Sequence, residues 1–226
     1  MEASGDHSDI REKAKELSED KQQMVEKLLG KIDEIKKLQT EEEGWKEATS
    51  KDGYTVHQKR TDNGLNCVKG QGIIDFSAEA VVKFINTPGN TEKYNSQYKK
   101  GSDIEKLDLG ISCAIDYSRY KGGTMISDRD FCMISGTIKQ DDGSYVTIAT
   151  SVEHPDCPEV KKCVRAECVI GGWIIIPDAE DPEHKCMCYY ITQTDPKGSI
   201  PKMFVNKVAK NQGLMPMTIN ETMKKE

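Results

Sequence analysis

The sequence predicts an α+β fold in which a long, curved antiparallel sheet encloses a cavity beneath a C-terminal helix. Three observations predict it: an N-terminal segment with apolar residues at helical spacing, seven segments that alternate between apolar and polar residues, and a final amphipathic stretch. The strand-like segments follow one another through short turns, as in antiparallel sheets. A strongly curved sheet crossed by one helix encloses space, so we expect an internal cavity.

The first helix is predicted between Ile10 and Leu38, where apolar residues recur every three or four positions. Residues 1–16 are so strongly charged that we expect a frayed arm ahead of a domain spanning residues 17–226. We interpret the helix as a packing element. A coiled-coil partner site is the weaker interpretation, because the heptads are few and irregular.

The seven strands are expected at Tyr54–Lys59, Asn66–Phe76, Asp103–Tyr117, Phe131–Lys139, Tyr145–Glu153, Cys163–Ile176 and Lys185–Thr194. Turn sequences at Asp62-Asn63-Gly64 and Asp141-Asp142-Gly143 mark hairpins. Ser77 is placed to cap a helix that follows the second strand. Pro201 is a favoured first residue for the last helix, which Gly213 and Pro216 should kink.

Composition excludes several classes of protein. A net charge of -6 argues against a nucleic-acid partner, which would need a basic surface. No stretch reaches the roughly 18–20 apolar residues of a membrane span, and residues 1–6 lack a signal-peptide pattern, so we expect a cytoplasmic protein. Eight cysteines without a C-x-x-C pair then predict reduced thiols that pack as small hydrophobes.

Catalytic and metal motifs are not evident. The sequence has no G-x-S-x-G, H-E-x-x-H or glycine-rich phosphate loop, so we expect neither an enzyme nor a cofactor. His184, Cys186 and Cys188 alternate along one strand in steps of about 6.5–7 Å, too far apart to converge on one metal ion. His154 is expected in a turn. The sequon at Asn220 has no expected role without a signal peptide.

Six motifs occur in the order and at the spacing of one family. They are Gly44-Trp45-Lys46, Ile126-Ser127-Asp128-Arg129-Asp130-Phe131, Ser151-Val152-Glu153-His154-Pro155-Asp156-Cys157-Pro158, Val164-Arg165-Ala166, Gly171-Gly172-Trp173 and Asp195-Pro196-Lys197-Gly198-Ser199-Ile200-Pro201. With them the chain resembles a START domain, the steroidogenic acute regulatory-related lipid-transfer family, and most of all its short cytosolic carriers of sterols and bile acids. The resemblance implies a helix-grip fold, a U-shaped sheet around a C-terminal helix with a tunnel for one lipid.

The resemblance also points to Asp116. In sterol-binding members, an acidic residue at this position pairs inside the tunnel with an arginine, whose position here is taken by Ser135. A buried carboxylate without its arginine should have a raised pKa or another partner. It favours a ligand that donates hydrogen bonds, such as a hydroxylated sterol. The lack of a cage aromatic at this position speaks against phosphocholine. The alternative, that Asp116 faces solvent, stays open.

The remaining candidate ligand contacts are Arg129, Phe131, Met125, Ile126, Phe204, Val208 and Gln212. We expect the loop Lys121–Ser127 and the C-terminal helix to form a gate whose apolar loop tip dips into a bilayer, with lysines of the helix attracting headgroups. The adjacent Arg129-Asp130 is interpreted as a structural ion pair rather than a catalytic one, because arginine stays protonated.

The sequence therefore predicts a monomer that binds one sterol, bile acid or similar amphiphile and transfers it between membranes, touching their surfaces briefly. Three alternatives remain at this point: a phospholipid or ceramide carrier of the same family, an enzyme on the same scaffold, and a lipid-sensing interaction module.

Overall fold

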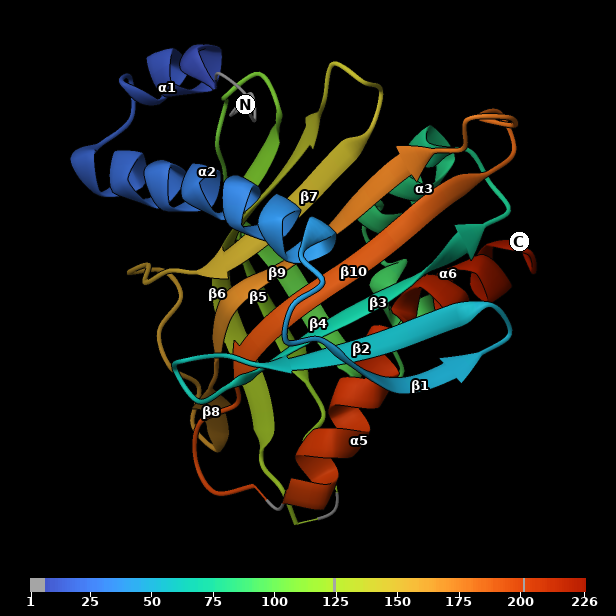
Figure 1. Cartoon of the computed structure of the whole chain (residues 1–226). Coiled ribbons are helices and arrows are strands. Elements are labelled where there is room, and N and C mark those ends of the chain that lie inside the picture. Colours follow the sequence, from blue (N-terminus) through green and yellow to red (C-terminus); the bar gives the residue numbers. More distant parts are fainter. Residues whose placement is uncertain (1–6, 124, 201) are drawn as a thin grey trace.

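A computed structural model describes residues 7–123, 125–200 and 202–226, except the side chains of 202–207. One curved sheet of ten strands dominates it (Figure 1), in the order β1-β2-β3-β10-β9-β7-β6-β5-β4, with β8 paired in parallel to β6. The strands are β1 (Lys46–Lys51), β2 (Tyr54–Arg60), β3 (Asn66–Ile74), β4 (Tyr98–Lys106), β5 (Ser112–Tyr120), β6 (Asp128–Lys139), β7 (Tyr145–Ser151), β8 (Cys163–Arg165), β9 (Glu167–Pro177) and β10 (Cys186–Asp195). The predicted fold class is confirmed.

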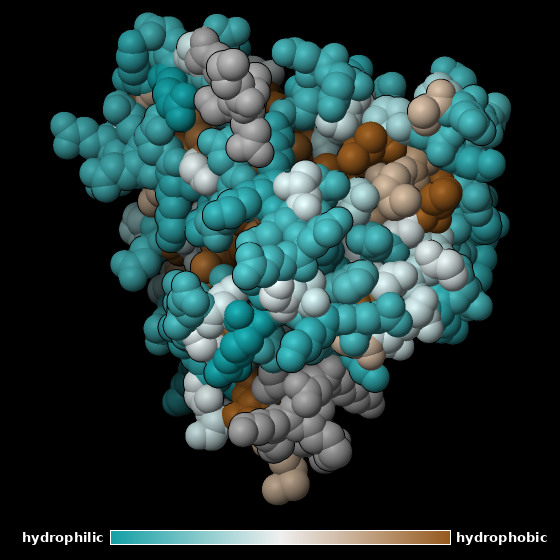
Figure 2. All heavy atoms as spheres, in the orientation of Figure 1, coloured by the Kyte–Doolittle hydropathy of each residue, from teal (hydrophilic) through white to brown (hydrophobic). Residues whose placement is uncertain are grey.

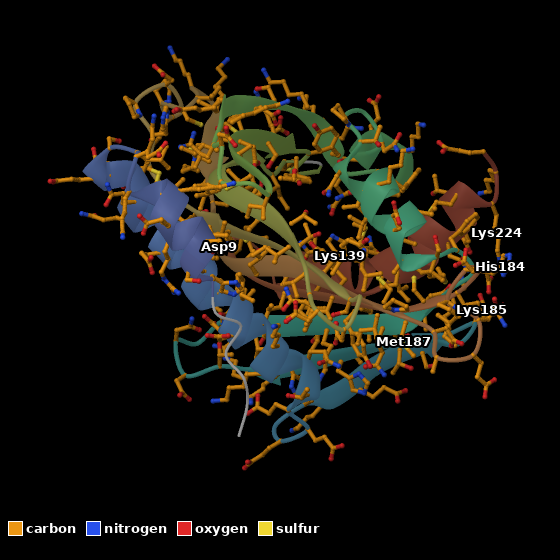
Figure 3. The ribbon with its side chains drawn as sticks, turned by 90° about the horizontal axis from the view of Figure 1, so that it is seen from above. Asp9, Lys139, His184, Lys185, Met187 and Lys224 are labelled. Carbon is orange, nitrogen blue, oxygen red and sulfur yellow. The ribbon has the colours of Figure 1, made fainter. Side chains whose placement is uncertain are left out.

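The helices are α1 (Ser8–Ala14), α2 (Glu19–Thr40), α3 (Ala78–Asn86), α4 (Thr91–Tyr94), α5 (Lys202–Gly213) and α6 (Met215–Met223). Viewed from above, α2 lies on one side of the molecule, and α3 and α6 lie on the other (Figure 3). The predicted cap of α3 is confirmed, because the Ser77 hydroxyl accepts a hydrogen bond from the backbone N–H of Ala80.

Several predicted boundaries were wrong. The strand expected at Asp103–Tyr117 is two strands, β4 and β5, joined by a turn in which Gly110 has a φ of +73°. Likewise Cys163–Ile176 is divided into β8 and β9. The edge strand β1 was missed because its mostly polar sequence shows no alternation of apolar residues. The boundaries of these strands depend on which strands pair with one another, and the hydrophobic periodicity of the sequence does not show strand pairing.

The expected first helix is also divided, into α1 and α2, and Ser18 precedes α2. Within the expected arm, Ile10 and Ala14 of α1 are buried in the same apolar cluster as α2. Residues 1–6 of the arm lie outside the described residues.

Side chains on the two faces of the sheet have different surroundings. On β6, Ile134 and Ile138 belong to the core cluster that includes α2, whereas Phe131, Met133 and Ser135 face the other way and line a cavity. Burial of each large aliphatic side chain in this cluster contributes about 1.5–3 kcal/mol. The outward-facing core therefore supports the sheet while its concave face remains open for a ligand.

Lys69 of β3 fixes the end of α2. Its side chain is buried, and the Nζ atom donates hydrogen bonds of 3.0–3.1 Å to the carbonyls of Leu38, Gln39 and Glu41. The same ammonium group lies 4.5 Å from the centre of the Trp45 ring. Carbonyls in the last turn of a helix have no partner within the helix, so a buried lysine is suited to satisfy them.

The C-terminal helices lie close against the sheet. A Cβ atom on Gly70 would come within 1.7 Å of the Gly213 carbonyl oxygen, so β3 and the junction of α5 and α6 approach backbone to backbone. The kink predicted at Gly213 and Pro216 is instead a break between two helices, because α5 ends at Gly213 and α6 begins at Met215. Asn220 of α6 is buried, and its amide bonds Tyr54 and Asp75, so this sequon side chain is held inside the fold.

Candidate functional site: an internal ligand cavity

A cavity of about 510 Å³ lies between the concave face of the sheet and the C-terminal helices. Its size falls within the roughly 300–1,000 Å³ typical of small-ligand sites. Strand pairing explains which residues line it: Ser135 is opposite Ala149, Ala149 is opposite Gly171, and Gly171 is opposite Thr192. Directly opposed residues share a face of a sheet, so this row of four small residues makes the floor of the cavity.

Aromatic side chains make much of the cavity wall. Trp173 and Tyr190 are cross-strand neighbours whose ring centroids are 4.4 Å apart, and Tyr120 meets Phe131 edge-on at 5.7 Å. Burial raises the pKa of Tyr120 and of Tyr190 above the ordinary value, so both keep their protons and can donate hydrogen bonds. This aromatic part of the wall is therefore apolar with a few hydroxyl groups, as suits an amphiphile.

Five of the residues predicted from the sequence line this cavity: Arg129, Phe131, Ser135, Val208 and Gln212. Met125 and Ile126 do not line it. They lie on the loop between β5 and β6, where Met125 is fully exposed. The side chain of Phe204 lies outside the described residues.

The sequence analysis missed the contributions of Tyr94, Thr147, Trp173 and Tyr190. Trp173 belongs to a motif used for the family resemblance, and it was not considered as a ligand contact. Alternation of side chains along the strands could have found three of them. Once Ser135 is placed in the cavity, the residues that share its face on the paired strands include Thr147, Trp173 and Tyr190.

Asp116 lies beside Ser135 on the same face of the sheet, one strand over, because it is paired with Met133, two residues before Ser135 on β6. The Ser135 hydroxyl lines the cavity and donates a 2.7 Å hydrogen bond to Oδ2 of Asp116, which is partly buried and is not itself among the lining residues. Desolvation by burial, together with the charge of Asp103, raises the pKa of Asp116 to about 6 although the Ser135 hydrogen bond opposes the shift. The arginine missing from this site is therefore replaced only by a neutral donor.

Asp116→Asn is expected to stabilise the protein at neutral pH and not at pH 4. The folded pKa, about 6, lies above the unfolded value of 3.8, so the folded state binds the proton more tightly. The protonated carboxyl contributes its full stability below about pH 4, and this contribution is lost as pH rises through 6. The loss at pH 7.5 is about 2–3 kcal/mol, and Asp116→Asn should avoid it. Urea unfolding of both proteins from pH 4 to 8 measures the difference. Parallel pH profiles would contradict this assignment.

The arginine and aspartate of the Arg129-Asp130 motif do not pair with each other, contrary to the sequence-based interpretation. Neighbouring residues of a strand point to opposite faces. Asp130 is fully buried and accepts hydrogen bonds of 2.9 and 3.4 Å from Arg165 of β8. Arg129 instead donates to the carbonyls of Ser127, Pro196 and Lys197. The motif ties two loops to the start of β6.

The other polar candidates have structural surroundings. The His154 ring accepts a hydrogen bond from the backbone N–H of Asp156, in the expected turn. His184 is exposed beside Asp181, whereas Cys186 and Cys188 are buried in the cluster that includes α3 and α6. Among the described residues, no group of three or more His, Cys, Asp or Glu side chains is arranged to hold a metal ion. All eight cysteines are free thiols.

Comparison with known families places the fold. A model described as "START domain" matches residues 31–225. START domain-containing protein 10 from Mus musculus is 27% identical over 188 residues, which are 81% of this chain and 61% of that protein. The chain thus spans about three fifths of that relative's length. StAR-related lipid transfer protein 5 from Mus musculus is 25% identical over 166 residues, 72% of this chain and 78% of that protein.

Solved structures give the same result. Human StAR-related lipid transfer protein 5 has a TM-score of 0.77 with 22% identity, covering 87% of this chain and 94% of that one. Human STARD10 has a TM-score of 0.73 with 25% identity, covering 85% and 78%. None of the helices within the described residues is both long and apolar enough to span a bilayer.

Proposed function

Because the chain belongs to the START domain family, we propose that it binds one lipid-like molecule in the cavity and transfers it between membranes. The observation that carries the proposal is the 510 Å³ cavity with aromatic walls on the concave face of the sheet. Burial of apolar ligand surface there contributes roughly 25 cal/mol per Å². The words "lipid transfer" in the name of one relative support the same function.

A sterol, bile acid or similar amphiphile suits this cavity best. Ser135 provides a hydroxyl to the cavity lining, and Asp116 places a partly buried carboxylate next to it, while aromatic and aliphatic side chains make much of the remaining wall. A ligand hydroxyl that bonds these groups would be oriented by them, because hydrogen bonds to charged groups contribute more than neutral ones. We place this exchange in the cytoplasm, with the monomer touching membranes only transiently.

Vesicle assays test the proposal. Purified protein should accelerate transfer of a labelled sterol or bile acid between donor and acceptor vesicles without nucleotide, and mass spectrometry should recover the ligand unaltered. A panel of sterols, bile acids, ceramide, phosphatidylcholine and fatty acids that showed neither binding nor transfer would contradict lipid carriage. Turnover of any of these compounds would instead favour an enzyme on the same scaffold.

The gate in this proposal is the loop Lys121–Ser127 together with α5. Met125 at the loop tip is fully exposed and has a φ of +63°, an uncommon conformation for a residue with a long side chain. The face of the molecule drawn in Figure 2 is largely hydrophilic. An exposed apolar side chain on a hydrophilic surface is suited to enter a bilayer.

Met125→Asp should slow transfer from vesicles several-fold to about tenfold without changing ligand affinity in solution. The change removes the apolar group that would insert, worth up to roughly 1.5–3 kcal/mol, and adds a charge. Met125→Asn separates the two causes, since Asn also tolerates the left-handed conformation and also removes the apolar group but adds no charge; it should slow transfer less than Met125→Asp. Stopped-flow transfer and calorimetry separate the two quantities. An equal transfer rate in all three proteins would remove the loop from the gate.

A further inference from the structure

Three cationic side chains, those of Arg60, Lys121 and Arg129, line one end of the cavity. We call them the basic mouth. Arg60 ends β2, Lys121 follows the end of β5, and Arg129 is the second residue of β6, and antiparallel pairing brings these strand ends to the same end of the sheet. Arg60 and Lys121 are exposed, so this end opens to solvent. Among the described lining residues, the charged ones are these three.

The basic mouth is notable because the chain carries 38 acidic and 32 basic residues, yet its cavity is lined by cations alone among the charged residues described. Elsewhere, cations close to these positions are neutralised. Arg119 pairs with Asp128 at 2.7 Å, and Lys197 pairs with Glu167 and Asp195, each at 2.8 Å. In the described part of the chain, no ion pair to a carboxylate is formed by any residue of the basic mouth.

Neutral oxygens hold the basic mouth in place. The three nitrogens of the Arg129 guanidinium donate to backbone carbonyls at 2.7–3.1 Å. Lys121 and Arg60 approach a carbonyl and a side-chain amide oxygen at 3.5 and 3.4 Å. Such partners orient a cation without cancelling its charge. Arg129 is half-buried, and this burial lowers the pKa of its guanidinium from the ordinary value.

The distance from the basic mouth to the Ser135–Asp116 pair defines the length of the site. Arg129 and Ser135 are six residues apart on β6, which corresponds to about 20 Å along a strand. Phe131 and Met133 line the cavity between them. The wall therefore runs from a cationic end, over an apolar middle, to the Ser135 hydroxyl, which is hydrogen-bonded to Asp116.

We propose, on the basis of the lipid-carrier function above, that the basic mouth binds the anionic group of the transported molecule. The ligand class is an amphiphile that has a carboxylate or another anion at one end, a rigid or extended apolar body, and a hydroxyl at the other end. The anion lies among Arg60, Lys121 and Arg129, and the hydroxyl reaches the Ser135–Asp116 pair. This orientation keeps the anion away from Asp116.

A matched pair of ligands tests the proposal without membranes: a hydroxylated steroid carboxylic acid and its uncharged methyl ester, titrated by calorimetry. The wild type should bind the acid about ten- to a hundred-fold more tightly, as charge-assisted hydrogen bonds allow. The double variant Arg60→Gln/Lys121→Gln should lose most of this preference by weakening the acid while leaving the ester unchanged. Arg129 is kept because it also holds two loops.

A control pair, Lys185→Gln/Lys225→Gln, changes net charge equally. Both lysines are exposed. Lys185 directly precedes β10 (Figure 3), at the end of that strand opposite the one near the basic mouth. The control pair should keep both affinities. An equal weakening of the acid in this pair would overturn the proposal, because net charge alone would then explain the effect.

The outcomes separate this proposal from lipid carriage itself. Equal affinities of the wild type for acid and ester would overturn the proposal that the basic mouth binds an anionic group. The protein would then still be a lipid carrier, but one without a preference for anionic ligands. Failure of both compounds, and of every lipid in the panel described above, would overturn the carrier function. If the double variant kept both affinities but transferred lipid more slowly from anionic vesicles, the cations would act on the membrane surface and not on the ligand, which also overturns the proposal.

Discussion

Ala149→Trp is expected to reduce ligand affinity by more than a hundredfold while leaving the fold intact. Ala149 is on the floor of the cavity, opposite Ser135 and Gly171, so an indole at this position projects into the space that a ligand would occupy. Overpacking is destabilising where a core is already filled, but here the added side chain enters an open cavity. Unfolding by urea should show equal or greater stability than the wild type.

Glu47→Trp is the matched control for Ala149→Trp, because it adds an indole to an exposed position on the edge strand β1. It should leave affinity and transfer unchanged. Fluorescence titration with a labelled sterol or bile acid measures the affinity of all three proteins. Undiminished binding by a folded Ala149→Trp protein would show that the ligand is bound elsewhere, and it would remove the main support for the proposed function.

Asp130→Leu is expected to destabilise the protein by about 3–5 kcal/mol. Asp130 has no solvent exposure, and its carboxylate is the ion-pair partner of Arg165, which also donates to the carbonyls of Cys157 and Pro158. Removing one partner of a buried ion pair leaves the other charge uncompensated, and this costs more than the pair itself contributes. The midpoint of urea unfolding should fall accordingly, with an unchanged slope.

The double variant Asp130→Leu/Arg165→Met sharpens this test. With both charges replaced by apolar side chains, much of the lost stability should return, because no isolated charge remains. The coupling energy from the four proteins isolates the pair from the effect of each substitution alone. If the double variant lost the sum of the two single losses, the ion pair would not be the source of the effect. A loss below about 1 kcal/mol in Asp130→Leu would also contradict it.

Elements with a local cause could be predicted from the sequence. The apolar repeat of α2, the alternation in β6 and β7, the Ser77 cap and the interruption at Gly213 all depend on residues within a few positions of each other. Short-range hydrogen bonding and side-chain periodicity decide such features, and both are legible in one sequence. The predicted antiparallel sheet and terminal helix followed from them.

Features that depend on strand pairing could not be predicted in this way. The separation of β4 from β5, the edge strand β1 and the parallel pairing of β8 with β6 are set by neighbours distant in the sequence. A polar edge strand has no apolar face to reveal it, since only its backbone joins the sheet. The partner of Asp130 was missed for the same reason, because Arg165 is 35 residues away.

The same distinction between local patterns and strand pairing applies to the residues of the candidate site. The sequence by itself identified the family resemblance and the substitution of Ser135 for an arginine, and alternation along β6 placed Phe131 and Ser135 on one face. Tertiary structure alone brought Asp116 within hydrogen-bonding distance of Ser135, brought Trp173 against Tyr190, and gathered Arg60, Lys121 and Arg129 at one end. The physical reason is that the cavity is a property of the curved sheet as a whole, and its lining is chosen by register between strands, which no local pattern encodes.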